Sequence, residues 1–428
     1  MNTEKLLEIL KASEADGFEV TDTKTRGWEF YFIRHQLDQN RARQTRSLQV
    51  RVFKSFEDGK YLGSAVSEIS PMATSEDAEK LIRDLVREAG VVKNPAYRLN
   101  GKSNEAARIP EPVSAEKTAG EFLASMMLVP ETDTEDINSY ELFVEENTRR
   151  IVNSEGVDVT EQYPSSMLEV VVNARNEDTE IELYRMYESG TCDPENLIDQ
   201  LVQTMQTGKD RLRAVPTPAL NQADVIFSTD AACEIFDYFL MQMNAALKYQ
   251  GLSSWEIGTP ITEQTNGDSI TLRAVRKLPN SSQNYFTDAE GAVIHDRTLI
   301  RGGIPENFWG NRQFSEYMEL RDSSIVCNYL VEGGEKTAEE LRTGRYLEIV
   351  EFSDFQCNPL TGDLAGEIRL GYLHDESGIT VVSGGSVSGS IRELISEMRF
   401  SKEQKQYNNA LIPAVVRLNG MTVTGKAE

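Results

Sequence analysis

Two turn-rich breaks divide the chain of 428 residues into three units. The first break spans residues 94–112, and the second is Val215-Pro216-Thr217-Pro218. Proline fixes φ and removes a backbone donor, so a proline-rich segment continues neither a helix nor a central strand. The chain is also too long for one ordinary core, because domains usually hold about 100–200 residues. We therefore predict three domains, at 1–100, 111–214 and 219–428.

The first two units share one order of elements, with helices enclosing antiparallel strands. For the first unit the pattern predicts helices over 3–15 and 76–90, strands at Trp28–Ile33, Leu48–Phe53 and Leu62–Ile69, and a turn over 57–60. For the second it predicts helices over 114–128 and Pro194–Lys209, with strands at Tyr140–Asn147, Arg150–Val152, Ser166–Ala174 and Thr179–Glu188.

The third unit is rich in strands and punctuated by glycine pairs. A strand at Asp224–Phe227 and a helix over 229–249 are expected first, and a helix over 388–399 precedes a last strand at Ala414–Leu418. Glycine pairs such as Gly302-Gly303 and Gly384-Gly385 suit the tight turns of a β architecture. The fold class is therefore expected to be α+β, with helix-plus-antiparallel-sheet N-terminal units followed by a largely β C-terminal domain.

Composition excludes several kinds of partner. The chain has 44 Lys and Arg against 69 Asp and Glu, a net charge of −25 that repels a phosphate backbone. Arg41, Arg43 and Arg46 form the densest basic group, which we expect in a solvated loop. No apolar run approaches the roughly 20 residues that span a bilayer, and the first residues lack a signal pattern. We expect no direct contact with nucleic acid or membrane, and a cytoplasmic location.

The four cysteines form no C-x-x-C pair, so neither a zinc knuckle nor a disulfide framework is predicted. We expect Cys192, Cys233, Cys327 and Cys357 to be reduced thiols. A phosphate-binding loop is not predicted either, because Gly302-Gly303 and Gly384-Gly385 lack the following Lys-Ser or Lys-Thr. No G-x-S-x-G turn for a serine nucleophile is present.

Five short motifs follow one another over residues 153–426. They are Asn153-Ser154-Glu155-Gly156, Asp288-Ala289-Glu290-Gly291 with the strand 298–303, Pro359-Leu360-Thr361-Gly362-Asp363, Ser388-Gly389-Ser390 with the helix that follows, and the segment 418–426. In this order they resemble the TldD/PmbA family, on its PmbA (TldE) side. Each motif is also a good turn or helix start whatever the function.

The resemblance implies a fold, an assembly and a set of motif residues. TldD-type members are metallopeptidases that hold zinc through His-Glu-x-x-x-His on a helix, and PmbA-type members pair with them to process or degrade peptides. The family also has a label as a modulator of DNA gyrase, which we interpret as an indirect effect of proteolysis. The resemblance also indicates nine motif residues, which either have a structural role or line a cleft for a peptide or partner. They are Asn153, Gly156, Asp288, Glu290, Gly291, Thr361, Gly362, Asp363 and Gly389.

The zinc motif itself is missing here. The corresponding helix begins Thr229-Asp230-Ala231-Ala232-Cys233-Glu234 and contains no histidine. Cys233 and Asp237 share a face at i and i+4, but one thiolate and one carboxylate fall short of the three protein ligands of a catalytic zinc site. We therefore predict no catalytic residues, no metal and no cofactor in this chain, with zinc only in a TldD-like partner.

Three functions remain open on the sequence. The first is a non-zinc subunit of a TldD/TldE-type assembly, as a heterodimer with the zinc subunit or a homodimer. The second is a stand-alone peptidase that assembles ligands from Cys233, His295 or His374. The third is a module that binds unfolded or extended peptides along a sheet edge. Hairpins around Gly302, Gly362 and Gly384 are the expected contact surface for a subunit or a peptide.

Overall fold

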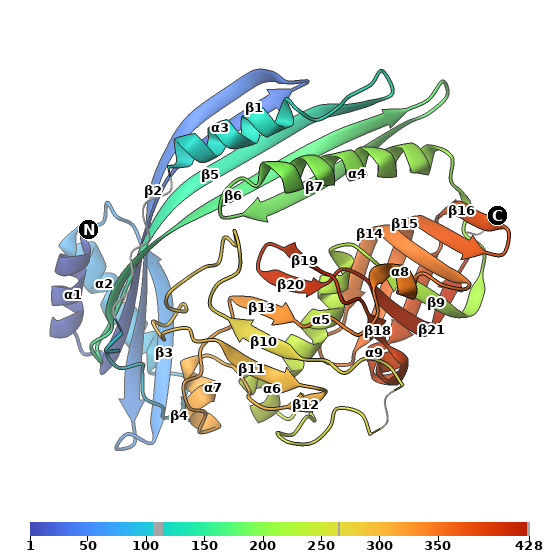
Figure 1. The fold of residues 1–428 in the computed structure, drawn as a ribbon. Helices are drawn as coiled ribbons and strands as arrows, with labels where there is room; N and C mark the ends of the chain where they lie inside the picture. Colours follow the sequence, from blue (N-terminus) through green and yellow to red (C-terminus); the bar gives the residue numbers. More distant parts are fainter. Residues whose placement is uncertain (106–113, 264–265, 426–428) are drawn as a thin grey trace.

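The computed structural model describes residues 1–105, 114–263 and 266–425 (Figure 1). Residues 106–112 of the first predicted break and Lys426 of the last motif lie outside this range. The first half of the chain forms α1 Thr3–Ala12, β1 Gly17–Ile33, β2 Gln36–Phe56, β3 Tyr61–Ile69, α2 Ser75–Ala89, β4 Asn94–Pro95, α3 Ala115–Met126, β5 Glu135–Asn153, β6 Asp158–Arg175, β7 Glu180–Ser189 and α4 Pro194–Leu212.

The second half contains shorter elements. They are β8 Val215–Pro216, β9 Leu220–Phe227, α5 Ala231–Gln242, α6 Ala245–Tyr249, β10 Leu272–Val275, β11 Arg297–Arg301, β12 Ile304–Pro305, α7 Arg312–Tyr317, β13 Asn328–Val331, α8 Ala338–Leu341, β14 Tyr346–Cys357, β15 Asp363–Asp375, β16 Gly378–Ser383, β17 Ser386–Ser390, α9 Ile391–Leu394, β18 Arg399–Phe400, β19 Gln404–Tyr407, β20 Ala410–Pro413 and β21 Val416–Thr424. The α+β class with a largely β C-terminal region is confirmed.

One antiparallel sheet runs through both N-terminal units, in the order β4-β3-β2-β1-β5-β6-β7. β1 joins the two units, because it pairs with β2 on one side and with β5 on the other. The pairing with β5 covers nearly the whole length of β1, from Glu19 opposite Asn153 to Ile33 opposite Ser139. The break at 94–112 therefore connects two parts of one sheet. In Figure 1 this sheet is the long curved layer above and beside the rest of the molecule.

Two cores cover one face of the sheet. α1 and α2 pack on Val20 and Val50, and α3 and α4 pack on Leu142 and Val170. Strand residues of one parity point to one face, which explains the alternating burial of β5 and β6. A capping box at α2, in which Thr74 and Asp77 bond each other's backbone, fixes the start of that helix.

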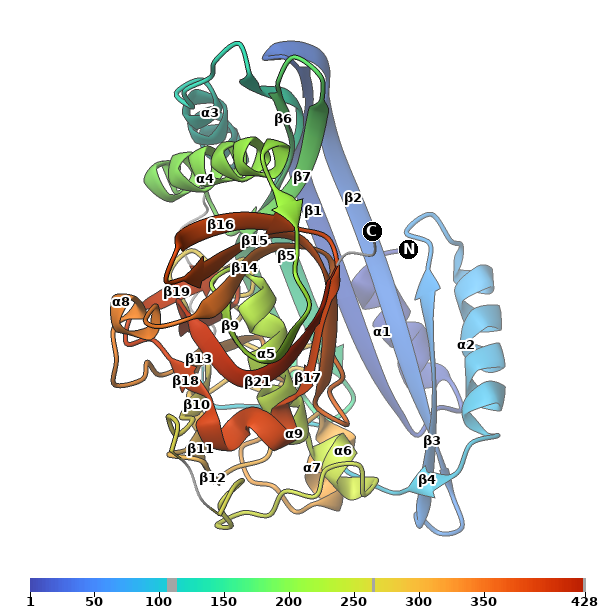
Figure 2. The same ribbon diagram turned by 90° about the vertical axis from the view of Figure 1, so that its right-hand side faces the viewer.

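The third domain contains two sheets around one core. The first has the order β12-β11-β10-β13-β20-β19. In the second, with the order β14-β9-β21-β17-β15-β16-β8, β14 also pairs with β15, so five strands close into a ring. Figure 2 shows this ring as a barrel, with α5 seen through its opening. α5 contacts β14 and β20, so it lies between the two sheets.

Four predicted elements differ from the structure. Arg41, Arg43 and Arg46 lie on β2, not in a loop, because Glu29 and Asp22 on β1 pair with their charges. The strands predicted at Tyr140–Asn147 and Arg150–Val152 are one strand, β5, since polar residues are tolerated on the face that no helix covers.

The other two differences concern helices of the third domain. The helix predicted over 229–249 is two helices, because Asn244 turns the chain and caps α6. The helix predicted over 388–399 begins only at Ile391, and Ser388 and Gly389 pair with β15 as strand β17. The second predicted break also contains a short strand, β8, which tolerates Pro216 because it lies at a sheet edge.

Within the described residues, every helix falls short of the length and apolarity that crossing a bilayer requires.

Candidate functional site

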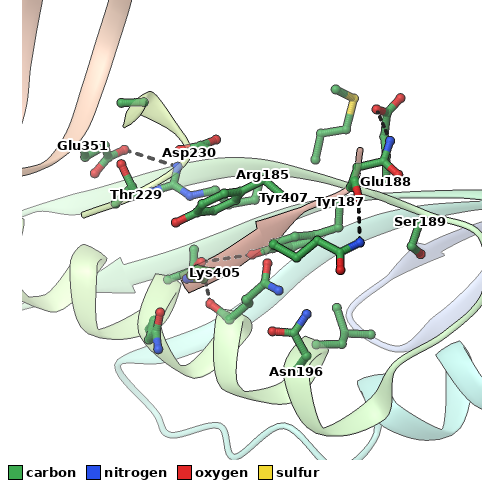
Figure 3. Close-up of a pocket in the computed structure, with 18 of the residues that line it drawn as sticks. Arg185, Tyr187, Glu188, Ser189, Asn196, Thr229, Asp230, Glu351, Lys405 and Tyr407 are labelled. Atoms are coloured by element: carbon green, nitrogen blue, oxygen red, sulfur yellow. Dashed lines mark hydrogen bonds and ion pairs between the residues drawn. The ribbon is translucent and has the colours of Figure 1, made fainter. Parts of the chain in front are cut away.

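A cleft of about 760 Å³ lies between the long sheet and the third domain. One wall is β7, the last strand of the seven-stranded sheet, with the neighbouring side of α4. The other wall is the first turn of α5, β14 and the hairpin of β19 and β20 (Figure 3). β19 is also the last strand of its sheet. Two sheet edges therefore border one cavity, and a sheet edge carries backbone groups that a further strand can pair with.

The first turn of α5 presents carboxylates to this cleft. Asp230 and Glu234 both line it, and a spacing of four residues places them on one face of the helix. Asp230 caps α5 only through its backbone, and neither carboxylate bonds or pairs with another residue in the described chain. The partial positive charge of a helix N-terminus favours carboxylates here.

The adjacent face of α5 points into the domain core. Cys233 and Asp237 lie beside Tyr329 of β13. Burial raises the pKa of Asp237 to about 6 and that of the Cys233 thiol well above its usual range. At neutral pH Cys233 is therefore a protonated thiol with a packing role, as the sequence suggested.

The residues of α5 do not fit a catalytic zinc ion. Such a site needs three protein ligands that converge on one point. Here Cys233 and Asp237 face Tyr329, whereas Glu234 faces the cleft. No group of three His, Cys, Asp or Glu side chains within residues 1–105, 114–263 and 266–425 is placed to hold a metal ion.

The three histidines lie on different elements, away from α5. His35 pairs with Glu131, the exposed His295 pairs with Glu105 at 2.8 Å, and His374 stacks on the ring of Tyr346. The stand-alone alternative needs His295 or His374 beside Cys233. The structure does not bring these side chains together.

A second set of polar groups lies across the cleft from α4. Glu351 of β14 is 9% exposed and lies 3.4 Å from Arg185 and 3.5 Å from Arg211, yet its Oε2 atom has no hydrogen-bond partner among the described residues. Lys405 makes no ion pair there, and burial lowers the pKa of its amine. The buried hydroxyl of Tyr407 is also without a partner in the described chain. The cleft thus contains unused hydrogen-bonding capacity.

The structure brings five of the nine motif residues together outside the cleft, at a contact between the long sheet and the third domain. Asn153 accepts hydrogen bonds from the backbone of Glu155 and Val157 at 3.0 Å and donates to the carbonyl of Asn100 at 2.7 Å. Gly156 has a φ of +96°, which completes this turn between β5 and β6. Asn100 in turn donates to the carbonyl of Glu290.

The motif around Asp288 forms the other side of this contact. The Asp288 carboxylate accepts three backbone hydrogen bonds of 2.9 Å, from Glu290, Ala292 and Ile325. Glu290 lies 3.3 Å from Arg51 of β2, and Gly291, with a φ of +79°, packs against Val157. We call this contact, together with Arg149 and Glu161 beside it, the junction.

The other four motif residues belong to the third domain, where Gly362 is buried and Thr361 and Asp363 are exposed. Thr361, Gly362 and Asp363 form the turn between β14 and β15, where Gly362 has a φ of +76° and lies against Tyr238 of α5. Gly389 packs against Met421, where a Cβ atom would lie 2.6 Å from the sulfur. None of the nine motif residues lines the described part of the cleft.

Sequence reasoning missed the residues that do line the cleft. Tyr184 to Ser189 carry no motif, and their position at a sheet edge depends on the order of strands. Lys405 and Tyr407 lie more than 200 residues later in the chain. A signal was present in Tyr184 and Met186, which are 54% and 52% exposed and unusually apolar for an open edge.

Two family models match most of the chain. Residues 108–205 match the model of the PmbA/TldA metallopeptidase central domain, and residues 221–425 match that of the PmbA/TldA metallopeptidase C-terminal domain. An uncharacterised protein of Methanocaldococcus jannaschii is 23% identical over 283 residues, which cover 62% of this chain and 65% of that protein. The match thus spans a little under two thirds of that relative.

Solved structures share the fold over nearly the whole chain. The crystal structure of TldE from Thermococcus kodakarensis has a TM-score of 0.77 at 16% identity, covering 98% of this chain and 100% of that one. A candidate modulator of a DNA gyrase from Thermotoga maritima has a TM-score of 0.75 at 15% identity, covering 98% of both chains. With family models matched over most of its length, this chain belongs to the TldD/PmbA family of metallopeptidase-type proteins.

Proposed function

We propose that this chain is the non-zinc, TldE-like subunit of a TldD/TldE-type assembly that processes or degrades peptides. The observation that carries the proposal is the first turn of α5. It forms a wall of the cleft at the start of the metallopeptidase C-terminal domain, and it offers Asp230 and Glu234 but no imidazole. Without converging ligands, the described residues form a binding cavity and offer no site for the metal of a hydrolytic centre.

The cleft suits an extended peptide. A strand added beside β7 or β19 would satisfy edge backbone groups, and affinity in this binding mode comes mainly from main-chain hydrogen bonds. The unpartnered Oε2 atom of Glu351 and the hydroxyl of Tyr407 supply further hydrogen-bonding sites for such a ligand, and the Lys405 amine lies beside them over the Tyr407 ring. We propose that the chain binds unfolded substrate here and that a zinc-bearing partner cleaves it.

The test uses the purified chain and a TldD-type protein that carries His-Glu-x-x-x-His from the same organism. Alone, the chain should hold no stoichiometric zinc by elemental analysis and should leave a disordered peptide intact. When mixed, the two should sediment as one complex and cleave the peptide. Cys233→Ala should leave this cleavage unchanged, because the thiol faces the core.

Three results would contradict the proposal. They are one zinc per chain that survives mild chelation, robust cleavage by the chain alone, and a monomer that ignores the partner. A large loss of activity in Cys233→Ala would contradict only the packing role of the thiol.

A further inference from the structure

The charged residues of the cleft are unequal in number. Six acidic and two basic side chains line its described part, namely Glu188, Asp193, Asp230, Glu234, Glu351 and Asp354 against Arg185 and Lys405. An enclosed surface with an excess of one sign concentrates ligands of the opposite sign. The cavity therefore favours a cationic occupant.

Contacts within the protein leave part of this negative charge uncompensated. Arg185 and Arg211 both lie on one oxygen of Glu351, and its other oxygen stays without a partner in the described chain although nine-tenths of the residue is buried. Asp230 and Glu234 make no hydrogen bond or ion pair there, although Asp230 lies near enough to Lys405 to oppose the lowering of that amine's pKa by burial. In Figure 3 Asp230 and Glu351 lie close together around the Arg185 side chain, at the end of the cleft where α5 begins.

The spacing of the two free carboxylates matches that of an extended peptide. Residues four apart on a helix have Cβ atoms about 5–6 Å apart. In a strand, side chains two residues apart project from the same face at about 6.8 Å. A strand added beside β7 could therefore direct two alternate side chains toward Asp230 and Glu234.

We propose that the cleft selects extended segments in which two basic residues are separated by one residue, Lys/Arg-x-Lys/Arg. One basic side chain pairs with Asp230 and the other with Glu234, while the peptide backbone pairs with the edge of β7. The inference rests on the proposed function, because it names the class of peptide that this site takes.

The test measures binding of four labelled disordered peptides of equal length to the purified full chain by fluorescence anisotropy. One contains Lys-x-Lys at its centre, one has the same two lysines at opposite ends, one has Ser-x-Ser and one has Glu-x-Glu. The Lys-x-Lys peptide should bind about tenfold more tightly than the Ser-x-Ser peptide, as expected for two partly exposed ion pairs. High salt should remove most of the difference.

A pair of variants separates the cleft from the general charge of the molecule. Asp230→Asn combined with Glu234→Gln should abolish the preference. Asp178→Asn combined with Glu376→Gln makes the same change in net charge at two exposed turns outside the cleft lining and should preserve it. Thermal denaturation of both variants confirms that they are folded.

Each outcome decides between the two proposals. If no peptide binds, the peptide cleft of the proposed function is wrong and this inference is wrong with it. If all four bind equally, or if the separated lysines bind as well as Lys-x-Lys, only this inference is overturned. Equal loss of preference in both variants would show that the net charge of the protein attracts basic peptides, which also overturns it.

Discussion

The junction and the cleft both lie between the long sheet and the third domain, but their carboxylates differ in whether they have hydrogen-bond and ion-pair partners. At the junction, the Glu161 carboxylate pairs with Arg149 and accepts hydrogen bonds from the backbone of Phe286 at 2.6 Å and the hydroxyl of Thr287 at 3.1 Å. In the cleft, Asp230 and Glu234 have no such partners within the described residues. One contact is saturated, and the other is open.

This difference distinguishes the motif residues at the junction, whose polar groups are saturated, from the residues of the cleft, which can bind a ligand. Buried charges are tolerated when each is paired and hydrogen-bonded, and such groups then fix one arrangement of the parts. Glu290 meets this description through its ion pair with Arg51 of β2. The neutral Asn153 is likewise saturated by hydrogen bonds, and Asp288 is satisfied by three backbone hydrogen bonds within the third domain. Ligand binding needs the reverse, since a group that is already saturated gains little from a new partner. The free carboxylates of the cleft meet that requirement.

The largest effect is expected from removing a junction charge. Glu161→Ala leaves Arg149 buried without its partner and should lower the free energy of unfolding by about 3–5 kcal/mol, the usual cost of breaking a buried pair. Urea titration measures this. Glu234→Gln, in the cleft, should change it by less than about 0.5 kcal/mol. Similar values for the two variants would erase the contrast between junction and cleft.

A smaller effect should depend on pH. Burial, reinforced by Glu290 and Asp288 and opposed by Arg51, raises the pKa of Glu19 from 4.5 to about 7. Between pH 4.5 and pH 7 the folded protein keeps the proton on Glu19 and the unfolded chain releases it. The contribution of this proton to the free energy of unfolding is therefore complete below pH 4.5 and is lost as the pH rises through 7.

Substituting Glu19 sharpens this expectation. Glu19→Gln removes the titrating group, so the variant should gain up to about 3 kcal/mol relative to the natural protein between pH 5 and pH 8. Urea titration of both proteins at the two pH values measures the gain. An identical difference at both values would show that Glu19 does not titrate in this window.

The smallest expected difference, about 2 kcal/mol, is between alanine substitutions at two glycines with positive φ. A Cβ atom at Gly291 would lie 2.7 Å from Val157, whereas one at Gly302 would meet no atom within 4 Å. Gly302→Ala should cost about 1 kcal/mol from backbone strain alone, and Gly291→Ala about 2 kcal/mol more from the clash at the junction. Thermal unfolding compares them. Equal costs would mean that Val157 moves aside and that the junction is less tightly packed than the distances indicate.

Much of the fold could be predicted from local patterns, and the site could not. Alternating apolar residues indicated most strands, and Glu76 with Asp77 indicated a helix from residue 76, one residue after the observed start of α2 at Ser75, which Thr74 caps. Asn244 shows the limit of such patterns, because a capping residue within an apolar stretch divided one predicted helix into two. The motif residues were found by resemblance, but their role at the junction depends on contacts between distant residues, such as those of Asn100 with Asn153 and Glu290, 53 and 190 positions away.

The sequence by itself determined the α+β class, the net charge of −25, the family and the absence of histidine from α5. These properties are local or compositional, so no knowledge of distant contacts is needed to obtain them. Only the tertiary structure decided that β1 and β5 join two units into one sheet, and that β7 and β19 become the edges that border the cleft. Strand order is set by which faces can be buried together across the whole chain. The position of a sheet edge, and of the free carboxylates that face it, is therefore not contained in any single segment.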